Sequence, residues 1–105
     1  MKVIFAPEVE NNLLELVEIL IRKGYLGTYD FAILYVEDLI QFIQTNIHTQ
    51  LKKKAPTYFN HFGADLWYIA YRRNKQTIWY IFFSQIGDTY WVRHISNNHV
   101  IAHHL

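Results

Sequence analysis

Histidine is concentrated at the C-terminal end of this chain. Four of the six histidines fall within the last 12 residues, namely His94, His99, His103 and His104. Imidazole titrates near neutral pH, so it can act as a general base or a general acid without a large pKa shift. The C-terminal third is therefore where we expect any acid–base chemistry. His94 also fits a packed position at the edge of the core, because it shares a predicted strand face with Val92.

Three arginines could stabilise negative charge. Arg72 and Arg73 close a predicted strand, where a guanidinium could hold a phosphate through two hydrogen bonds. The same residues also suit a solvated hairpin turn. Arg93 is expected on one strand face with Trp91 and Ile95, so its charge must emerge at a rim or find a partner.

A run of lysines, Lys52, Lys53 and Lys54, follows the second predicted helix. Together with Arg73 and Lys75 it could bind a nucleic-acid backbone by displacing counterions. Lysines at the C-terminal end of a helix also complement the helix dipole, and the sequence favours neither interpretation.

A metal site is the alternative use of the histidines. His99 and His103 are four residues apart, which would place two ligands on one helical face. No carboxylate stands nearby to complete a ligand set, and the chain has no cysteine. We expect no metal and no cofactor.

Periodicity predicts the elements that position these residues. Val3–Phe5 is a short apolar run, and Pro7 suits the first turn of a helix predicted over residues 7–23. Thr28 can cap a second helix that keeps one apolar face until Thr49. The short connection over residues 24–27 predicts that the two helices are antiparallel neighbours.

The remainder is predicted to be a loop over residues 51–65 followed by three strands. Aromatic and β-branched residues dominate 66–72, 77–84 and 89–95, and turn residues separate these segments. With the N-terminal strand they predict a four-stranded antiparallel sheet. The helical hairpin covers one face of it, which defines an α+β fold.

Both faces of this sheet are apolar. In the segment 77–84 one face carries Ile78, Tyr80 and Phe82, and the other carries Trp79, Ile81 and Phe83. Two helices can cover only one face, so we expect a peptide, a partner chain or a second copy in a homodimer on the other. The alternative is that the C-terminal tail or the 51–65 loop folds over it.

Length and composition indicate one folded domain spanning residues 1–105. The apolar fraction is 51%, and the formal net charge of +1 neither requires nor excludes a nucleic-acid partner. The first residues form too short an apolar run for a secretory signal, and no stretch is long enough to span a membrane. We expect a cytoplasmic protein without a membrane partner.

The order of elements resembles the RelE/ParE toxin superfamily of bacterial type II toxin–antitoxin systems. The resemblance covers nearly the whole chain and is carried by Val3–Glu8, the strands beginning at Trp67 and Trp79, and the closing segment from Arg93 to His99. It implies a cognate antitoxin that covers the working surface. Four aromatic residues are expected to contact that antitoxin: Trp67, Tyr71, Trp79 and Tyr80.

The resemblance also implies the activity. RelE-like members cleave messenger RNA on the ribosome without a metal, and the candidates for charge stabilisation and acid–base catalysis are Arg72, Arg93, His94, His99, His103 and His104. ParE-like members instead inhibit DNA gyrase without an RNase site. A catalytically inactive, antitoxin-binding member is the third expectation.

Overall fold

The protein is described by a computed structural model over residues 1–24 and 28–105. These residues form an α+β arrangement of strands, helices and 3-10 helices (η). In chain order they are β1 (Lys2–Phe5), α1 (Pro7–Arg22), α2 (Tyr29–Asn46), β2 (Lys53–Lys54), η1 (Thr57–Phe62), β3 (Trp67–Arg72), β4 (Ile78–Ile86), β5 (Thr89–Asn97), α3 (Asn98–Ile101) and η2 (Ala102–His104).

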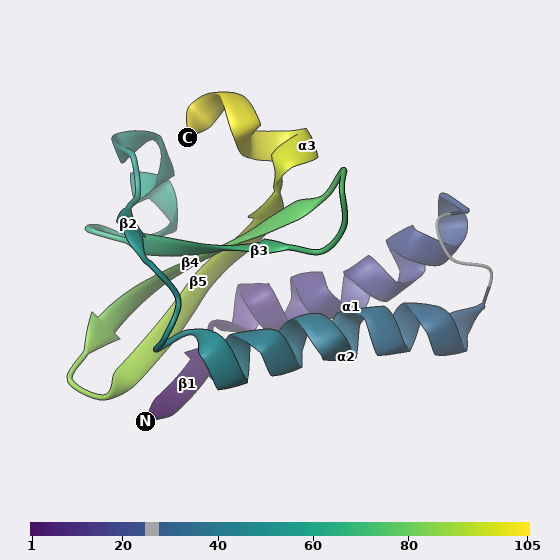
Figure 1. The fold of residues 1–105 in the computed structure, drawn as a ribbon, viewed down its shortest axis with the longest axis horizontal. Coiled ribbons are helices and arrows are strands. Elements are labelled where there is room, and N and C mark those ends of the chain that lie inside the picture. Colours follow the sequence, from purple (N-terminus) through teal and green to yellow (C-terminus); the bar gives the residue numbers. More distant parts are fainter. Residues whose placement is uncertain (25–27) are drawn as a thin grey trace.

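The two long helices lie side by side and run in opposite directions (Figure 1). Pro7 occupies the first turn of α1, and the Thr28 hydroxyl accepts a hydrogen bond from the Phe31 N–H at the start of α2. The Tyr29 hydroxyl donates to the Glu18 carboxylate at 3.0 Å, which ties the start of α2 to α1. Both predicted helices are confirmed, and most of the predicted 24–27 connection lies outside the described residues.

The sheet has five strands in the order β1-β5-β4-β3-β2. The prediction of a four-stranded antiparallel sheet is wrong in two respects. β1 pairs in parallel with β5, an arrangement that a tight turn would forbid and that the long connection through two helices permits. The two-residue β2 adds a fifth strand, although a lysine run has no strand signal of its own.

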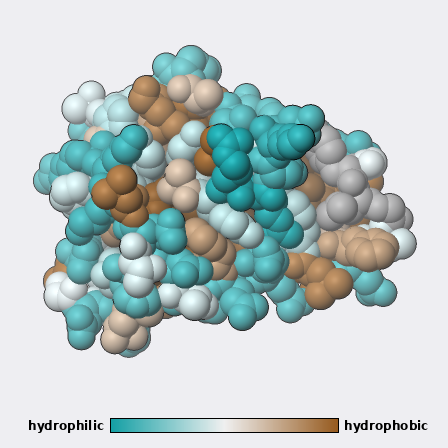
Figure 2. Space-filling view, in the orientation of Figure 1, coloured by the Kyte–Doolittle hydropathy of each residue, from teal (hydrophilic) through white to brown (hydrophobic). Residues whose placement is uncertain are grey.

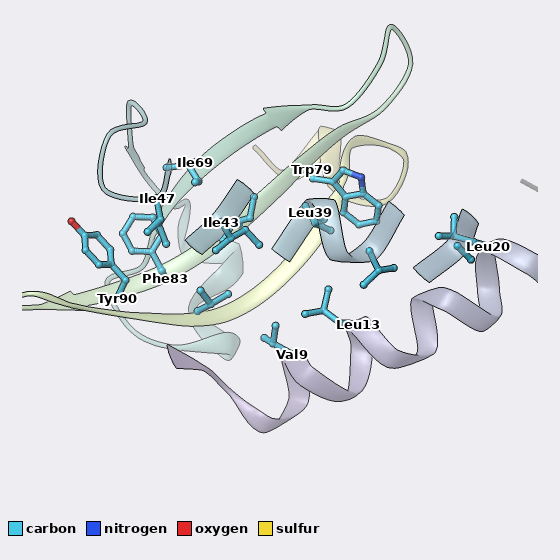
Figure 3. Close-up of a cluster of buried hydrophobic side chains, with 14 residues drawn as sticks. Val9, Leu13, Leu20, Leu39, Ile43, Ile47, Ile69, Trp79, Phe83 and Tyr90 are labelled. Carbon is cyan, nitrogen blue, oxygen red and sulfur yellow. The ribbon is translucent and has the colours of Figure 1, made fainter. Parts of the chain in front are cut away.

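The main core lies between the helices and one face of the sheet (Figure 3). The helices contribute apolar residues at three- and four-residue spacing, such as Leu13, Leu39 and Ile43. The sheet contributes alternate residues of its strands, including Ile81 and Phe83 in β4. This face holds the largest continuous set of buried side chains among the described residues.

The chain covers part of the opposite face by itself. Phe59 of η1 and Ile101 of α3 pack there against Leu66 and Phe82, and all four are buried. In Figure 1 these two segments lie on the side of the sheet away from α1 and α2. The predicted 51–65 loop is therefore wrong, since it contains β2 and η1. Coverage by the chain's own loop and tail, one of the two sequence-based alternatives, is observed for part of this face.

A β-bulge changes which residues of β5 share a face. Phe82 pairs with His94 but Phe83 pairs with Val92, so Arg93 is an extra residue without a partner in β4. Beyond the bulge the alternation is reversed, and Ile95 joins Val92 in the helix-side core. The predictions that His94 shares a face with Val92, and Arg93 with Ile95, are wrong because strict alternation cannot anticipate a bulge.

Figure 2 shows the surface of the face that carries α2. Hydrophilic residues dominate it, and hydrophobic residues occur as separate patches. None of the described helices combines the length and the apolar character that a membrane span requires.

Candidate functional site

The sheet face opposite the long helices, called the second face below, carries a groove of about 390 Å³ next to the C-terminus. Its lining residues come from β2 and the segment before it, from β3 and β4, and from the chain's end: Leu51, Lys53, Tyr68, Ala70, Tyr80 and Leu105. The strand register brings them together, since Lys53 is opposite Tyr68 and Ala70 is opposite Tyr80. Residues directly opposite one another project to the same side of a sheet, so all four face the groove.

Two tyrosine rings form the aromatic part of this groove. The rings of Tyr68 and Tyr80 have centroids 5.9 Å apart and an interplanar angle of 68°. Both side chains are half-buried. Ala70, the residue opposite Tyr80, has only a methyl group, and this leaves space beside the rings. The groove therefore presents aromatic surface on which a planar group can stack.

The lysine run is divided between the two faces. The Nζ atoms of Lys52 and Lys54 lie 4.7 Å and 5.1 Å from the centroid of the Trp67 ring, on the helix side. Lys54 also contacts the Asp65 carboxylate at 3.6 Å. Lys53, opposite Tyr68, is the lysine of this run that lines the groove. Of the four lysines predicted to contact nucleic acid, Lys52, Lys53, Lys54 and Lys75, only Lys53 lines the groove.

Arg72 and His99 both border the hairpin between β3 and β4. Arg72 projects to the second face one step beyond Ala70, and its Nη1 donates to the Lys75 carbonyl at 3.3 Å. Lys75 itself is exposed within the hairpin. The His99 Nε2 lies 3.3 Å from the Thr77 hydroxyl. Arg72 and His99 are thus the pair of predicted catalytic residues that the hairpin brings to one end of the sheet.

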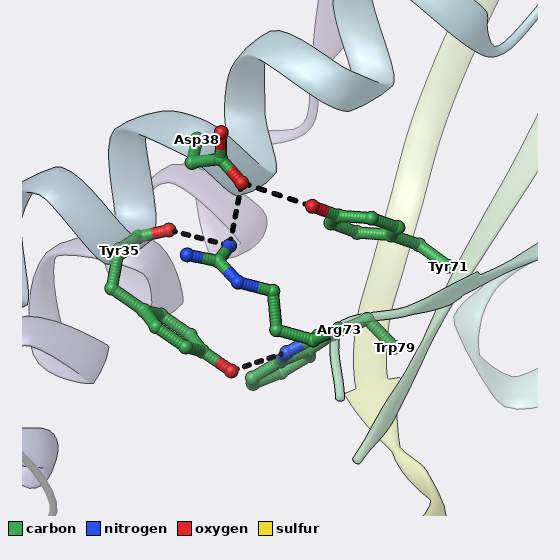
Figure 4. Close-up of polar contacts among 5 residues, drawn as sticks. All are labelled: Tyr35, Asp38, Tyr71, Arg73 and Trp79. Carbon is green, nitrogen blue, oxygen red and sulfur yellow. Dashed lines mark hydrogen bonds and ion pairs between the residues drawn. The ribbon is translucent and has the colours of Figure 1, made fainter. Parts of the chain in front are cut away.

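Arg73, the residue after β3, is held on the helix side of the sheet (Figure 4). Its Nη1 lies 2.8 Å from the Asp38 carboxylate and donates to the Tyr35 carbonyl at 3.2 Å. The guanidinium also lies 3.9 Å from the Tyr35 ring centroid. Tyr71 donates to Asp38 at 2.9 Å, and burial followed by this hydrogen bond raises the pKa of Tyr71. Arg73 therefore anchors the hairpin to α2 instead of facing the groove.

Arg93 and His94 lie at the bulge of β5, beside η1. The Arg93 side chain is exposed and passes close to Gly63. The His94 ring stacks on Phe62 with centroids 3.6 Å apart and an angle of 8° between the planes. Burial, with the charge of His61 as a smaller cause, lowers the pKa of His94 to about 4. His94 is therefore neutral at pH 7 and packed as a flat aromatic ring.

His103 and His104 lie at a third place, where the tail meets η1. The His104 ring stacks on Tyr58 at 3.6 Å between centroids, and its own neighbour His103 is 3.9 Å away. Partial desolvation and the charge of His103 both lower the pKa of His104. These contacts hold the C-terminal tail against η1.

The six residues predicted to catalyse are thus not assembled into one constellation. They occupy three places: Arg72 and His99 at the hairpin, Arg93 and His94 at the bulge, and His103 and His104 at the tail. Between residues of different places, no hydrogen bond is formed within the described part of the chain. Arg72 is the one of the six that projects to the second face beside the groove.

The four aromatic residues predicted to contact an antitoxin are divided between the two faces of the sheet. Trp79 is only 6% exposed and belongs to the helix-side core, and Trp67 and Tyr71 pack against that core. Tyr71 stacks on Phe42 of α2 with centroids 3.9 Å apart. Tyr80 alone among the four lies in the second-face groove.

Sequence reasoning missed three residues of the groove, Leu51, Ala70 and Leu105, and assigned no role to Tyr68. Alternation along the strands places Tyr68, Ala70 and Tyr80 on one face, so this pattern alone would have been enough to identify Tyr68 and Ala70 as neighbours of Tyr80. No local pattern in the lysine run predicts that β2 pairs with β3, which is what brings Lys53 and Leu51 to the groove.

No cluster of three metal-ligating side chains occurs within residues 1–24 and 28–105. Comparisons of the chain with protein-family models, with curated proteins and with solved structures find no match.

Proposed function

We propose that this protein is the toxin of a type II toxin–antitoxin pair and inhibits translation by acting on messenger RNA at the ribosome. The observation that supports this most is the second-face groove, where Lys53 and two tyrosine rings lie together beside Arg72. The order of one strand, two helices and a three-stranded meander, which resembles the RelE/ParE superfamily, supports the same proposal.

The groove has the chemistry that single-stranded RNA requires. Proteins bind single strands through aromatic rings on which bases stack and through cations that follow the phosphates. Tyr68 and Tyr80 supply rings, and Lys53 and Arg72 supply cations on the same face. A guanidinium can also stabilise the additional negative charge on a phosphate during cleavage.

Within this proposal, His99 is the candidate for proton transfer. It is exposed, it lies at the same hairpin as Arg72, and no aromatic stack encloses it in the described structure. His94 is less suited to this role, because its low pKa makes it a weak base and its ring is packed on Phe62.

A second candidate function is binding without catalysis, as in gyrase inhibition or in an inactive antitoxin-binding member. The observation that favours it is the separation of the six predicted catalytic residues into three places. A protein that acts by contact alone requires no convergent acid, base and cation.

The test is controlled expression in a bacterial host, with labelled methionine incorporation as the readout of translation. Wild-type protein should suppress incorporation, and Lys53→Glu should relieve the suppression by roughly tenfold or more, since it reverses the charge that faces the phosphate. Tyr68→Ala should act in the same direction by removing a stacking surface.

Lys54→Glu is the matched control, because Lys54 lies on the helix side over Trp67. It should leave the suppression unchanged, and circular dichroism should show that all variants are folded. DNA breaks with intact messages would support the gyrase alternative. Normal growth with the wild-type protein would support the inactive one.

A further inference from the structure

The outer edge of β3 is only partly covered. β2 pairs with Trp67 and Tyr68, whereas β3 continues to Arg72. Residues 69–72 have β4 on one side, and among the described residues no strand lies on their other side. An open strand edge is a template on which another extended chain can pair.

The hydrogen-bond pattern identifies the groups that face this edge. The Arg73 N–H donates to the Thr77 carbonyl at 2.9 Å, so the odd-numbered residues of β3 bond toward β4. The Ala55 N–H donates to the Leu66 carbonyl at 2.9 Å, so the even-numbered residues bond outward. The N–H and C=O groups of Ala70 and Arg72 accordingly point to the open edge, and both residues are exposed.

A hollow lies on each side of this edge. On the second face is the groove bordered by Lys53, Tyr68 and Ala70. On the helix side is a hollow of about 230 Å³, lined by Asp38, Gln41, Phe42, Thr45, Asn46 and Tyr71. Successive residues of a strand project to opposite faces. A strand added here would therefore direct its side chains alternately into the two hollows.

Charge indicates which side chains fit. A residue placed opposite Ala70 or Arg72 projects to the second face, where Lys53 and Arg72 are both cationic. The residue between them projects toward the stacked rings of Phe42 and Tyr71. Pairing with a second copy of the chain would bring the Lys53 and Arg72 side chains of both copies to one face, and like charges disfavour that.

We propose that the open edge of β3 at Ala70–Arg72 binds an extended segment of a partner protein by strand addition, with an acidic–apolar–acidic sequence at its centre. The backbone of Ala70 and Arg72 provides the pairing groups, Lys53 and Arg72 bind the two carboxylates, and Phe42 with Tyr71 packs against the apolar residue. This site shares Lys53 and Arg72 with the groove proposed to bind RNA, but peptide binding at the edge does not require that the protein cleaves RNA.

The probe is a short fluorescent capped peptide with the central sequence Glu-Val-Glu, titrated with the full chain and followed by fluorescence anisotropy. Saturable binding is expected, and it should weaken by roughly tenfold or more for Gln-Val-Gln and further for Lys-Val-Lys. Amide resonances of Ala70 and Arg72 should shift on binding more than those of Tyr71, whose N–H bonds toward β4.

Two variants test the edge itself. Ala70→Pro removes an outward N–H without touching the ladder to β4, so it should reduce binding by roughly tenfold or more while the thermal melting curve is retained. Ala70→Ser keeps the N–H and should bind like the wild type. Arg72→Glu should reverse the preference from Glu-Val-Glu to Lys-Val-Lys.

The proposal is overturned if the wild-type protein shows no saturable binding of Glu-Val-Glu, or if the amides of Ala70 and Arg72 do not shift. It is also overturned if folded Ala70→Pro binds as well as Ala70→Ser. If an oligouridylate shifts these two amides and the peptide does not, the edge belongs to an RNA site and the peptide proposal fails. This readout is separate from the translation assay, so the two proposals can fail independently.

Discussion

The two faces of the sheet differ in the segments that pack against them. The helix side is packed by two long helices on alternate strand residues, and its buried side chains form one continuous cluster. Among the described residues, the second face has four buried apolar side chains, and it is covered in part by two short segments, η1 and the C-terminal tail. Aromatic stacks that include His94 and His104 hold those segments in place.

This difference suggests that one face of the sheet contributes mainly to stability and the other mainly to binding. Burial of apolar surface is the largest favourable contribution to folding, so the helix side should determine most of the stability. The second face retains a groove, two cations and an open strand edge, and all of them can contact another molecule. The same sheet thus has one face for the fold and one that remains available for binding.

The largest effect should come from truncating the helix-side core. Phe83 and Phe82 are adjacent, fully buried and on opposite faces, so they form a matched pair. Phe83→Ala should destabilise the protein by about 3–5 kcal/mol, since the cavity lies between rigid layers. Phe82→Ala should cost about 2–3 kcal/mol, because η1 and the tail can move into the space.

Urea denaturation of both variants measures the two losses in the free energy of unfolding. A larger loss for Phe82→Ala than for Phe83→Ala would mean that the second face, with its short segments, contributes as much to stability as the helix side. That result would contradict the division between the two faces.

A smaller effect is expected for the two neighbouring arginines. Arg73→Ala should lower the free energy of unfolding by about 1–2 kcal/mol, because its side chain is 19% exposed and lies 2.8 Å from Asp38. Arg72→Ala should change it by less than about 0.5 kcal/mol, since the Arg72 side chain is exposed.

A double-mutant cycle with Asp38→Ala isolates the contribution of the Arg73 ion pair. A coupling energy near zero would show that the anchor in Figure 4 does not stabilise the hairpin.

The smallest effect is a pH dependence of the second face. His94 has a pKa of about 4 in the folded chain against 6.5 for an ordinary histidine, so the unfolded state binds more protons between these values. Stability should therefore fall as the pH is lowered through this window. Since the ring is partly solvated, we expect a loss of about 1 kcal/mol between pH 7.5 and 5.5.

His94→Phe is the control for this dependence, because it keeps a flat ring on Phe62 and removes the titrating group. Its stability should change less than that of the wild type over the same pH interval, as measured by urea denaturation. Equal slopes for both proteins would assign the pH dependence to other groups.

Much of the fold follows from local patterns in the sequence. The apolar spacing along residues 7–23, Pro7 at a first turn and Thr28 as a cap predict both long helices within a few residues of their observed bounds. The aromatic segments predict the three strands of the meander. These features depend on neighbours within a few positions of the chain, so periodicity detects them.

The candidate site was less predictable because it depends on register. One extra residue, Arg93, reverses the alternation of β5 and places His94 on the second face with Phe62. Arg72 and Arg73 look equivalent in sequence, yet alternation places Arg72 on the second face beside the groove and Arg73 against Asp38 of α2.

The sequence by itself determined an α+β chain with two amphipathic helices and strands that are apolar on both faces. Only the tertiary structure decided what covers the second face, how β1 and β2 join the sheet, and which cations reach the groove. The physical reason is the distance along the chain between the residues that interact. Helical and strand periodicity come from interactions between near neighbours, whereas coverage, pairing and the bulge arise from contacts between segments far apart in the chain.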